Sequence, residues 1–340
     1  MRPGRREYAA VMSARNITLT LLLTTSLLVA CGTTPAPKLD DTWTWTGGDW
    51  HELSAPFGAH PGWRQDAVFV YDPAAKQVLM FGGEGPSTSC PNVTVCELGE
   101  TWAWSGQWTR VDLKVAPRPR TAASAGYDPV TKQVIMFGGW AAADVVQRAD
   151  VGNPIDVLTD TWAWDGSQWS QLAPLHSPPG GGPESMAWDS ATKTLVMIAG
   201  ASTWSWNGTD WTMHESADQP TSGIVYADDS LGMAMIIGPT GQFSWTGIKW
   251  VWKSPLTYRG DAGVAFNPLS TLLMSFGSGG CGGIGGNNAQ TWVSADDGWQ
   301  SLPTTTHPPA RAGSYLAYDA DIGGLVMFGG YQSWGCGGFT

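Results

Sequence analysis

The sequence repeats a cassette whose clearest copy reads Gly126-Tyr127-Asp128, then Val134-Ile135-Met136-Phe137-Gly138-Gly139, then Asp160-Thr161-Trp162-Ala163-Trp164, and finally Trp169. Each piece is short, rich in β-branched or aromatic residues and bounded by turn residues, which is typical of β-strands. The connection that contains Asp165-Gly166 tolerates the positive φ of a tight hairpin. The cassette therefore predicts four strands arranged as two consecutive hairpins.

The cassette recurs along the chain. Its aromatic strands begin at Asp41, Glu100, Asp160, Ser202, Gly241 and Gln290. Its apolar strands begin at Val78, Val134, Leu195, Met235, Leu272 and Leu325. A strand that is apolar on both faces must be covered on both faces, as happens in a radial stack of sheets. The aromatic strands begin 39 to 60 residues apart, and a unit that recurs at this spacing predicts a repeat architecture in which each unit packs between two neighbours.

The strand-ending Phe-Gly-Gly, the Tyr-Asp pair before it and the spaced tryptophans after it resemble kelch-repeat β-propellers, such as the central domain of galactose oxidase. The resemblance covers Asp41 to Gly330 and implies an all-β, six-bladed kelch-type propeller with four antiparallel strands per blade. The copies containing Trp204 and Phe243 depart most, because both lack the full Gly-Gly. The chain starts with a Trp hairpin and ends with a Gly-Gly strand, so we expect one blade closed by both termini, which removes open edges. Seven blades would leave half a blade unmatched.

The composition agrees with this architecture. The chain has 340 residues, of which 42% are hydrophobic and 14% charged, and its 44 Gly, 23 Pro and 21 Trp favour short strands over long helices. This length allows either one closed β domain or two smaller ones. The net charge of -11 repels phosphate backbones, so nucleic acid is not an expected partner.

The first forty residues resemble a targeting segment. Several arginines precede an apolar run from Ile17 to Ala30, which is too short to span a bilayer and is typical of a signal peptide. Leu28-Val29-Ala30-Cys31 resembles the lipobox of bacterial lipoproteins, which implies cleavage before Cys31 and its acylation. We expect a signal peptide over 1–30, a lipidated cysteine and flexible tether over 31–40, and the propeller over 41–340. The alternatives are an ordinary secretory signal and a start at Met12.

Cysteine usage fits an extracytoplasmic protein anchored by lipid to a bacterial cell membrane. Removing Cys31 leaves Cys90, Cys96, Cys281 and Cys336, an even number in an oxidising compartment. Of the three possible pairings we favour Cys90 with Cys96 and Cys281 with Cys336. Free thiols are the alternative.

No catalytic, metal or cofactor site is predicted. The best-known kelch enzyme uses copper, but the histidines here lack metal-ligand spacing; they are His51, His60, His176, His214 and His307. Ser294 to Trp299 begins a sialidase-type Asp box, but its Trp comes two positions early, and no carboxylate pair for glycoside hydrolysis is placed. The glycine-rich Gly277 to Gly282 is not followed by a helix that could hold a pyrophosphate.

The most suggestive pattern is a set of arginines at Arg64, Arg120, Arg259 and Arg311. Each lies eight residues before the Asp or Asn that ends an innermost strand. In kelch propellers this segment lies near one mouth of the central channel, so the resemblance implies a cationic ring that binds an anionic group. The alternative is that each arginine pairs with an Asp or stacks on a Trp within its own blade.

Two further tryptophans, Trp140 and Trp334, follow Gly-Gly strands and are candidate stacking platforms for sugars, with burial under the loops as the alternative. Three functions remain open at this point. The first is a monomeric, non-catalytic module that binds a protein, peptide or carbohydrate ligand, with no membrane contact beyond the lipid anchor. The second is a carbohydrate-active enzyme on a galactose oxidase- or sialidase-like propeller, and the third is a structural spacer. The fold alone does not choose among them.

Overall fold

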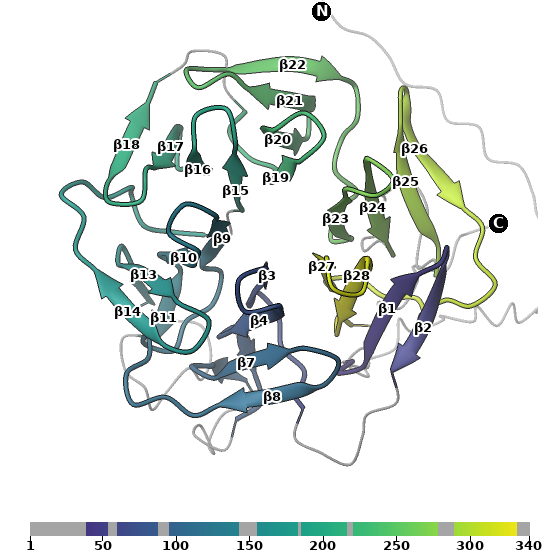
Figure 1. Ribbon diagram of the computed structural model, residues 1–340, viewed down its shortest axis with the longest axis horizontal. Helices are drawn as coiled ribbons and strands as arrows, with labels where there is room; N and C mark the ends of the chain where they lie inside the picture. Colours follow the sequence, from purple (N-terminus) through teal and green to yellow (C-terminus); the bar gives the residue numbers. More distant parts are fainter. Residues whose placement is uncertain are drawn as a thin grey trace, which may run out of the picture. The chain divides into compact units, whose positions relative to one another are not determined.

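A computed structural model of the chain describes residues 39–53, 60–87, 95–142, 155–182, 185–215, 220–277 and 289–331. These residues form six four-stranded antiparallel sheets that surround a central axis as the blades of a propeller (Figure 1). The described residues contain no helix. The all-β, six-bladed architecture predicted from the sequence repeat is confirmed.

Five blades are built from strands that follow one another along the chain, and we number them in that order, listing strands from the axis outward. The first blade consists of β3 (Val68–Asp72), β4 (Gln77–Phe81), β7 (Thr101–Trp104) and β8 (Trp108–Val111), and the second consists of β9 (Ser124–Asp128), β10 (Gln133–Phe137), β13 (Thr161–Trp164) and β14 (Trp169–Leu172). The third blade consists of β15 (Met186–Asp189), β16 (Thr194–Ala199), β17 (Ser202–Trp206) and β18 (Trp211–His214), and the fourth consists of β19 (Ile224–Asp228), β20 (Met233–Gly238), β21 (Gly241–Trp245) and β22 (Trp250–Ser254). The fifth blade consists of β23 (Gly263–Asn267), β24 (Leu272–Phe276), β25 (Thr291–Ala295) and β26 (Gly298–Leu302). Two short hairpins are inserted in the first and second blades, namely β5 (Glu84–Gly85) with β6 (Cys96–Glu97) and β11 (Trp140–Ala142) with β12 (Ile155–Val157).

The sixth blade joins the two ends of the described chain. Its inner strands are β27 (Tyr315–Asp319) and β28 (Gly324–Phe328), and its outer strands are β1 (Thr42–Thr46) and β2 (Asp49–Leu53). Trp43 lies opposite Met327 in the antiparallel pairing of β1 with β28. In Figure 1 the purple β1 and β2 therefore complete a sheet begun by the yellow β27 and β28. The expected closure by both ends is confirmed.

The second strand of each blade forms the core. Leu79 and Met327 are completely buried and Ile135 is 1% exposed, because side chains on both faces of these strands pack against neighbouring blades. The unbroken apolar runs in the sequence follow from this two-sided burial, since each blade is covered on either side by another. The structure thus explains why these strands do not alternate between apolar and polar residues.

Tryptophans join neighbouring blades. In five blades a tryptophan at or next to the start of the outermost strand donates its indole N–H to a threonine at or next to the start of the third strand of the preceding blade. The five pairs are Trp50 with Thr291 (2.7 Å), Trp108 with Thr42 (2.9 Å), Trp169 with Thr101 (3.1 Å), Trp211 with Thr161 (3.0 Å) and Trp250 with Thr203 (2.8 Å). In the fifth blade Trp299 instead donates to the backbone oxygen of Thr257, at 2.7 Å. The outermost strand of the fifth blade therefore makes a different tryptophan hydrogen bond from the outermost strands of the other blades.

Candidate functional site

Three of the four arginines that the repeat places at one level are buried inside their own blades. The clearest is Arg120, which is 1% exposed. Its Nη1 and Nη2 donate to the two carboxylate oxygens of Asp160 at 2.6 and 2.8 Å, and Nη1 also donates to the backbone oxygen of Gly138 at 2.8 Å. Its Nε donates to the backbone oxygen of Arg118 at 3.1 Å. Every nitrogen of this guanidinium group is therefore satisfied by the protein itself.

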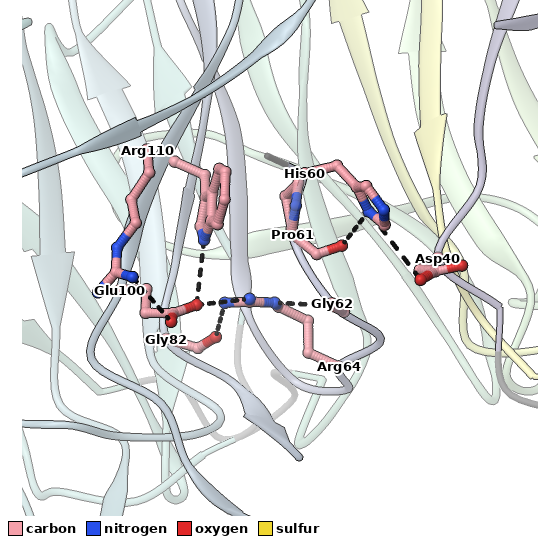
Figure 2. Close-up of polar contacts among 9 residues, drawn as sticks. Asp40, His60, Pro61, Gly62, Arg64, Gly82, Glu100 and Arg110 are labelled. Atoms are coloured by element: carbon pink, nitrogen blue, oxygen red, sulfur yellow. Dashed lines mark hydrogen bonds and ion pairs between the residues drawn. The ribbon is translucent and has the colours of Figure 1, made fainter. Parts of the chain in front are cut away.

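The same arrangement recurs at Arg311 and Arg64. Arg311 binds both carboxylate oxygens of Asp41 at 2.6 and 2.7 Å, so this pair also connects the two ends of the sixth blade. Arg64 donates to Glu100 at 2.9 Å and to the backbone oxygen of Gly82 at 3.1 Å. Figure 2 shows the carboxylate of Glu100 between Arg64 and the more exposed Arg110. We call each such unit an arginine latch.

Each latch has a third member, the first tryptophan of the aromatic strand. Its indole N–H donates to the same carboxylate, from Trp43 to Asp41 at 2.7 Å, from Trp102 to Glu100 at 3.1 Å and from Trp162 to Asp160 at 2.6 Å. The acid always stands two residues before that tryptophan in the sequence. Guanidinium and indole donors therefore converge on one carboxylate in three blades.

We expect part of the stability that the arginine latches contribute to be lost at low pH. Burial raises the pKa of Asp160, but the hydrogen bonds and charge of Arg120 and the indole bond of Trp162 outweigh it, so this pKa lies below its usual 3.8. A pKa lower in the folded than in the unfolded state gives stabilisation that is complete above about pH 4 and lost as pH falls through the folded value. A double-mutant cycle on Arg120 and Asp160, measured by urea unfolding from about pH 7 down to about pH 3, should show a shrinking coupling energy. A coupling energy independent of pH would contradict this.

The third and fourth blades lack the latch altogether. The arginine position is Gly181 in the third blade and Pro220 in the fourth, and the acid position is Ser202 or Gly241. Arginine and acid are thus both present in three blades and both absent in two. This co-occurrence is the signal in the sequence that identifies Asp41, Glu100 and Asp160 as the partners of the arginines, and the spacing of the arginines alone does not reveal it.

The fifth blade breaks the rule because it keeps the arginine without the acid. Gln290 stands at the acid position and is exposed. The guanidinium carbon of Arg259 lies 3.9 Å from the ring centroid of Trp292, so the arginine stacks on the tryptophan. Arg259 Nε and Nη2 and Trp292 Nε1 are buried and have no hydrogen-bond partner among the described residues. Burial lowers the pKa of Arg259, as expected of a cation that lacks a carboxylate partner.

The sequence predicted a ring of four arginines available to a ligand, but in the structure three of the four are bound to carboxylates of their own blades. Arg64, Arg120 and Arg311 fulfil the alternative role, because each guanidinium is committed to a carboxylate and to backbone oxygens within its blade. Arg259 also fulfils it in part, because it stacks on Trp292 of its own blade. Arg259 alone among the four keeps buried donors without acceptors in the described part of the chain. Of the four arginines, Arg259 is accordingly the one that remains a candidate for binding a ligand.

The structure describes only some of the other predicted site residues. Trp140 is half-buried in β11, where it lies opposite Val157, so it is not a freely exposed platform. Cys96 is buried in β6. Trp334, Cys31, Cys90, Cys281 and Cys336 lie outside the described residues, so sugar stacking, lipidation and both disulfide pairings stay predictions.

A cavity of about 250 Å³ lies in the central channel where the innermost strands begin. Residues from five of the six blades line it, and most have small side chains, among them Ala67, Ala123, Ser185, Ala262 and Ser314. The Tyr315 hydroxyl at its wall accepts a hydrogen bond from the backbone N–H of Ala67 at 2.8 Å. The buried hydroxyl of Ser314, in contrast, has no hydrogen-bond partner among the described residues. A polar group that is buried and unpaired is costly, so this wall favours an occupant with polar atoms.

Two kinds of feature are absent from the described residues. They contain no cluster of three or more His, Cys, Asp or Glu side chains arranged to hold a metal ion. They also contain no helix long and apolar enough to cross a membrane. The apolar run from Ile17 to Ala30 lies outside the described residues.

Comparison with known proteins yields distant structural likenesses only. No protein-family profile matches the sequence, and no curated protein matches it. Among solved structures, YjhT is 12% identical, with a TM-score of 0.49 over 79% of this chain and 99% of that chain. A structural genomics protein of unknown function from Bacteroides thetaiotaomicron is 9% identical, with a TM-score of 0.46 over 86% of this chain and 76% of that chain. YCF48 bound to a D1 peptide is 12% identical, with a TM-score of 0.37 over 70% of this chain and 68% of that chain. No function is transferred from likenesses at this level.

Proposed function

We propose that this chain is a non-catalytic binding propeller of the kelch type, which holds a protein, peptide or carbohydrate ligand at the channel mouth where the innermost strands begin. The observation that supports this most directly is the cavity of about 250 Å³ lined by five blades. Small side chains at the starts of the innermost strands leave this end of the channel open. Ligand pockets are concave and combine apolar side chains with a few polar groups, and this cavity combines alanine side chains with Ser185, Ser314 and Tyr315.

The proposal includes the localisation that we expect from the N-terminal sequence. Cleavage before Cys31 and acylation of its thiol would tether the propeller outside a bacterial cell membrane, with the residues up to position 40 as the linker. A tethered propeller presents its channel mouths to the surroundings, which suits a receptor better than an enzyme that releases a diffusible product. The net negative charge of the chain fits a soluble module whose only membrane contact is the lipid.

The test is a peptide and glycan array probed with residues 38–340, followed by a variant that fills the cavity. Ala123 lines the cavity and is partly exposed, so Ala123→Phe places a ring in the open space without displacing a core residue. We expect this variant to bind array ligands at least about ten-fold more weakly, since about 1.4 kcal/mol of binding energy corresponds to that factor. The matched control is Ala320→Phe, at an exposed hairpin turn outside the cavity.

The two variants must have melting temperatures close to the wild type for the comparison to hold. Equal binding by Ala123→Phe, Ala320→Phe and the wild type would place the ligand elsewhere and contradict the role of the channel. An array without any binder, peptide or glycan, would contradict the binding function itself.

A further inference from the structure

The fifth blade retains two members of an arginine latch and lacks the third. Arg259 and Trp292 occupy the positions held by Arg120 and Trp162 in the second blade, while Gln290 replaces Asp160. In the second blade all donors of the latch have acceptors. In the fifth, the arginine Nε and Nη2 and the indole Nε1 are buried with none. What is missing is therefore one carboxylate.

The free donors form a particular edge of the guanidinium group. In the second blade Nε of Arg120 is used by the backbone oxygen two residues earlier, that of Arg118. In the fifth blade the corresponding oxygen belongs to Thr257, and it accepts the indole N–H of Trp299 instead. The Nε and Nη2 edge of Arg259 is consequently left without acceptors among the described residues, and two parallel N–H groups on one edge match the two oxygens of a carboxylate.

The framework of the propeller does not require Arg259. The third and fourth blades fold with Gly181 and Pro220 at this position, so a blade without a latch is tolerated. Arg259 is half-buried, and keeping its Nε and Nη2 buried without acceptors in the described part of the chain costs stability. The third blade, which lacks arginine and acid together, leaves only the indole N–H of Trp204 unpaired at the latch position among the described residues. Retention of the arginine without its acid is the pattern expected of a site whose acceptor comes from another molecule.

We propose that Arg259 and Trp292 form a binding site for a carboxylate supplied by an acidic side chain of a peptide or protein ligand. In three other blades the arginine Nη2 donates to an Asp or Glu side chain, and at Arg259 the same kind of side chain would come from a ligand and accept from Nη2 together with Nε. The backbone oxygen of Arg259 accepts a hydrogen bond from the backbone N–H of Ala262, which lines the channel cavity, so Arg259 lies at the end of the fifth blade where its innermost strand begins. This inference rests on the proposed binding function and names its ligand class.

The test uses substitutions that supply or remove one member of the latch. Gln290→Asp places the missing carboxylate in the chain itself, where it would compete with that of a ligand. Gln290→Asn is the matched control, with the same length and no charge. Arg259→Met removes the cation and keeps an apolar stem over Trp292. Peptides on the array are tested as pairs in which each Asp or Glu peptide has an Asn or Gln counterpart.

We expect acidic peptides to bind the wild type and Gln290→Asn at least about ten-fold more tightly than their amide counterparts, a difference of about 1.4 kcal/mol. This preference should vanish in Gln290→Asp and in Arg259→Met. Independently of any ligand, Gln290→Asp should melt higher than Gln290→Asn, by roughly 2 °C, because it completes a fourth latch. The melting comparison keeps the proposal testable whichever ligand binds.

The outcomes separate this inference from the binding function on which it rests. If array ligands bind and Ala123→Phe abolishes their binding, but Gln290→Asp and Arg259→Met bind as well as the wild type, the carboxylate site is wrong and the binding function stands. Binding of glycans without any acidic peptide has the same meaning. A lower melting temperature for Gln290→Asp than for Gln290→Asn would overturn the inferred geometry. An array on which nothing binds would overturn both proposals.

Discussion

A chain that begins at His60 is expected not to reach a monomeric, cooperatively folded state. It lacks β1 and β2, so β28 becomes an open edge whose backbone groups lose the partners that they have in the full sheet. An open hydrophobic edge is a template for pairing with other chains. Arg311 would keep its buried guanidinium and lose both oxygens of Asp41. Trp50, which is completely buried, would leave a large void next to Phe276 of the fifth blade.

The measurement is light scattering after size-exclusion chromatography together with thermal unfolding. The control begins at Pro37 and keeps the 28 strands that the described residues form. We expect the control to be a monomer with a single transition, and the shorter chain to form oligomers or to unfold over a broad range. A synthetic peptide of residues 37–53 added to the shorter chain should restore part of the native transition by supplying the two strands. A stable monomer that begins at His60 would show that closure does not depend on them.

The repeat in the sequence carries enough information to predict this closure. Six Trp hairpins and six apolar strands fix the number of blades, and the order in which they occur leaves only the first hairpin to complete the last sheet. The prediction works because a periodic pattern specifies how each unit packs against the next, so the local pattern and the global fold agree. The same pattern placed the second strands in the core, where Leu79 and Met327 are completely buried.

The candidate site was less predictable, because its chemistry depends on a pairing between two segments far apart in sequence. Arg120 and Asp160 are forty residues apart, and Arg311 and Asp41 lie at opposite ends of the chain. Identical spacing suggested that four arginines are equivalent, whereas their partners divide them into three latched and one unlatched. The channel cavity was not predicted either, since the small residues at the starts of the innermost strands have no signature of their own.

The second large effect is expected from breaking one latch. Arg120→Ala leaves the carboxylate of Asp160 without either guanidinium bond and the backbone oxygen of Gly138 without its donor. Removing one partner of a buried ion pair destabilises by about 3–5 kcal/mol, and the 23% exposure of the Asp160 side chain places this pair near the lower end. We expect the midpoint of urea unfolding to fall accordingly.

Two comparisons decide whether this loss comes from the latch. The double variant Arg120→Met with Asp160→Leu removes both charges and fills much of the volume, so it should recover most of the stability lost by Arg120→Ala, because no charge is left unpaired. Arg259→Met at the equivalent position of the fifth blade should cost little or even stabilise the protein, since it removes buried donors that have no acceptors among the described residues. Equal losses at Arg120 and Arg259 would mean that both arginines contribute only packing, and the distinction between latched and unlatched blades would have no energetic basis. A large difference would show that the propeller gains stability from Arg120 and not from Arg259, which leaves the latter to be explained by a ligand.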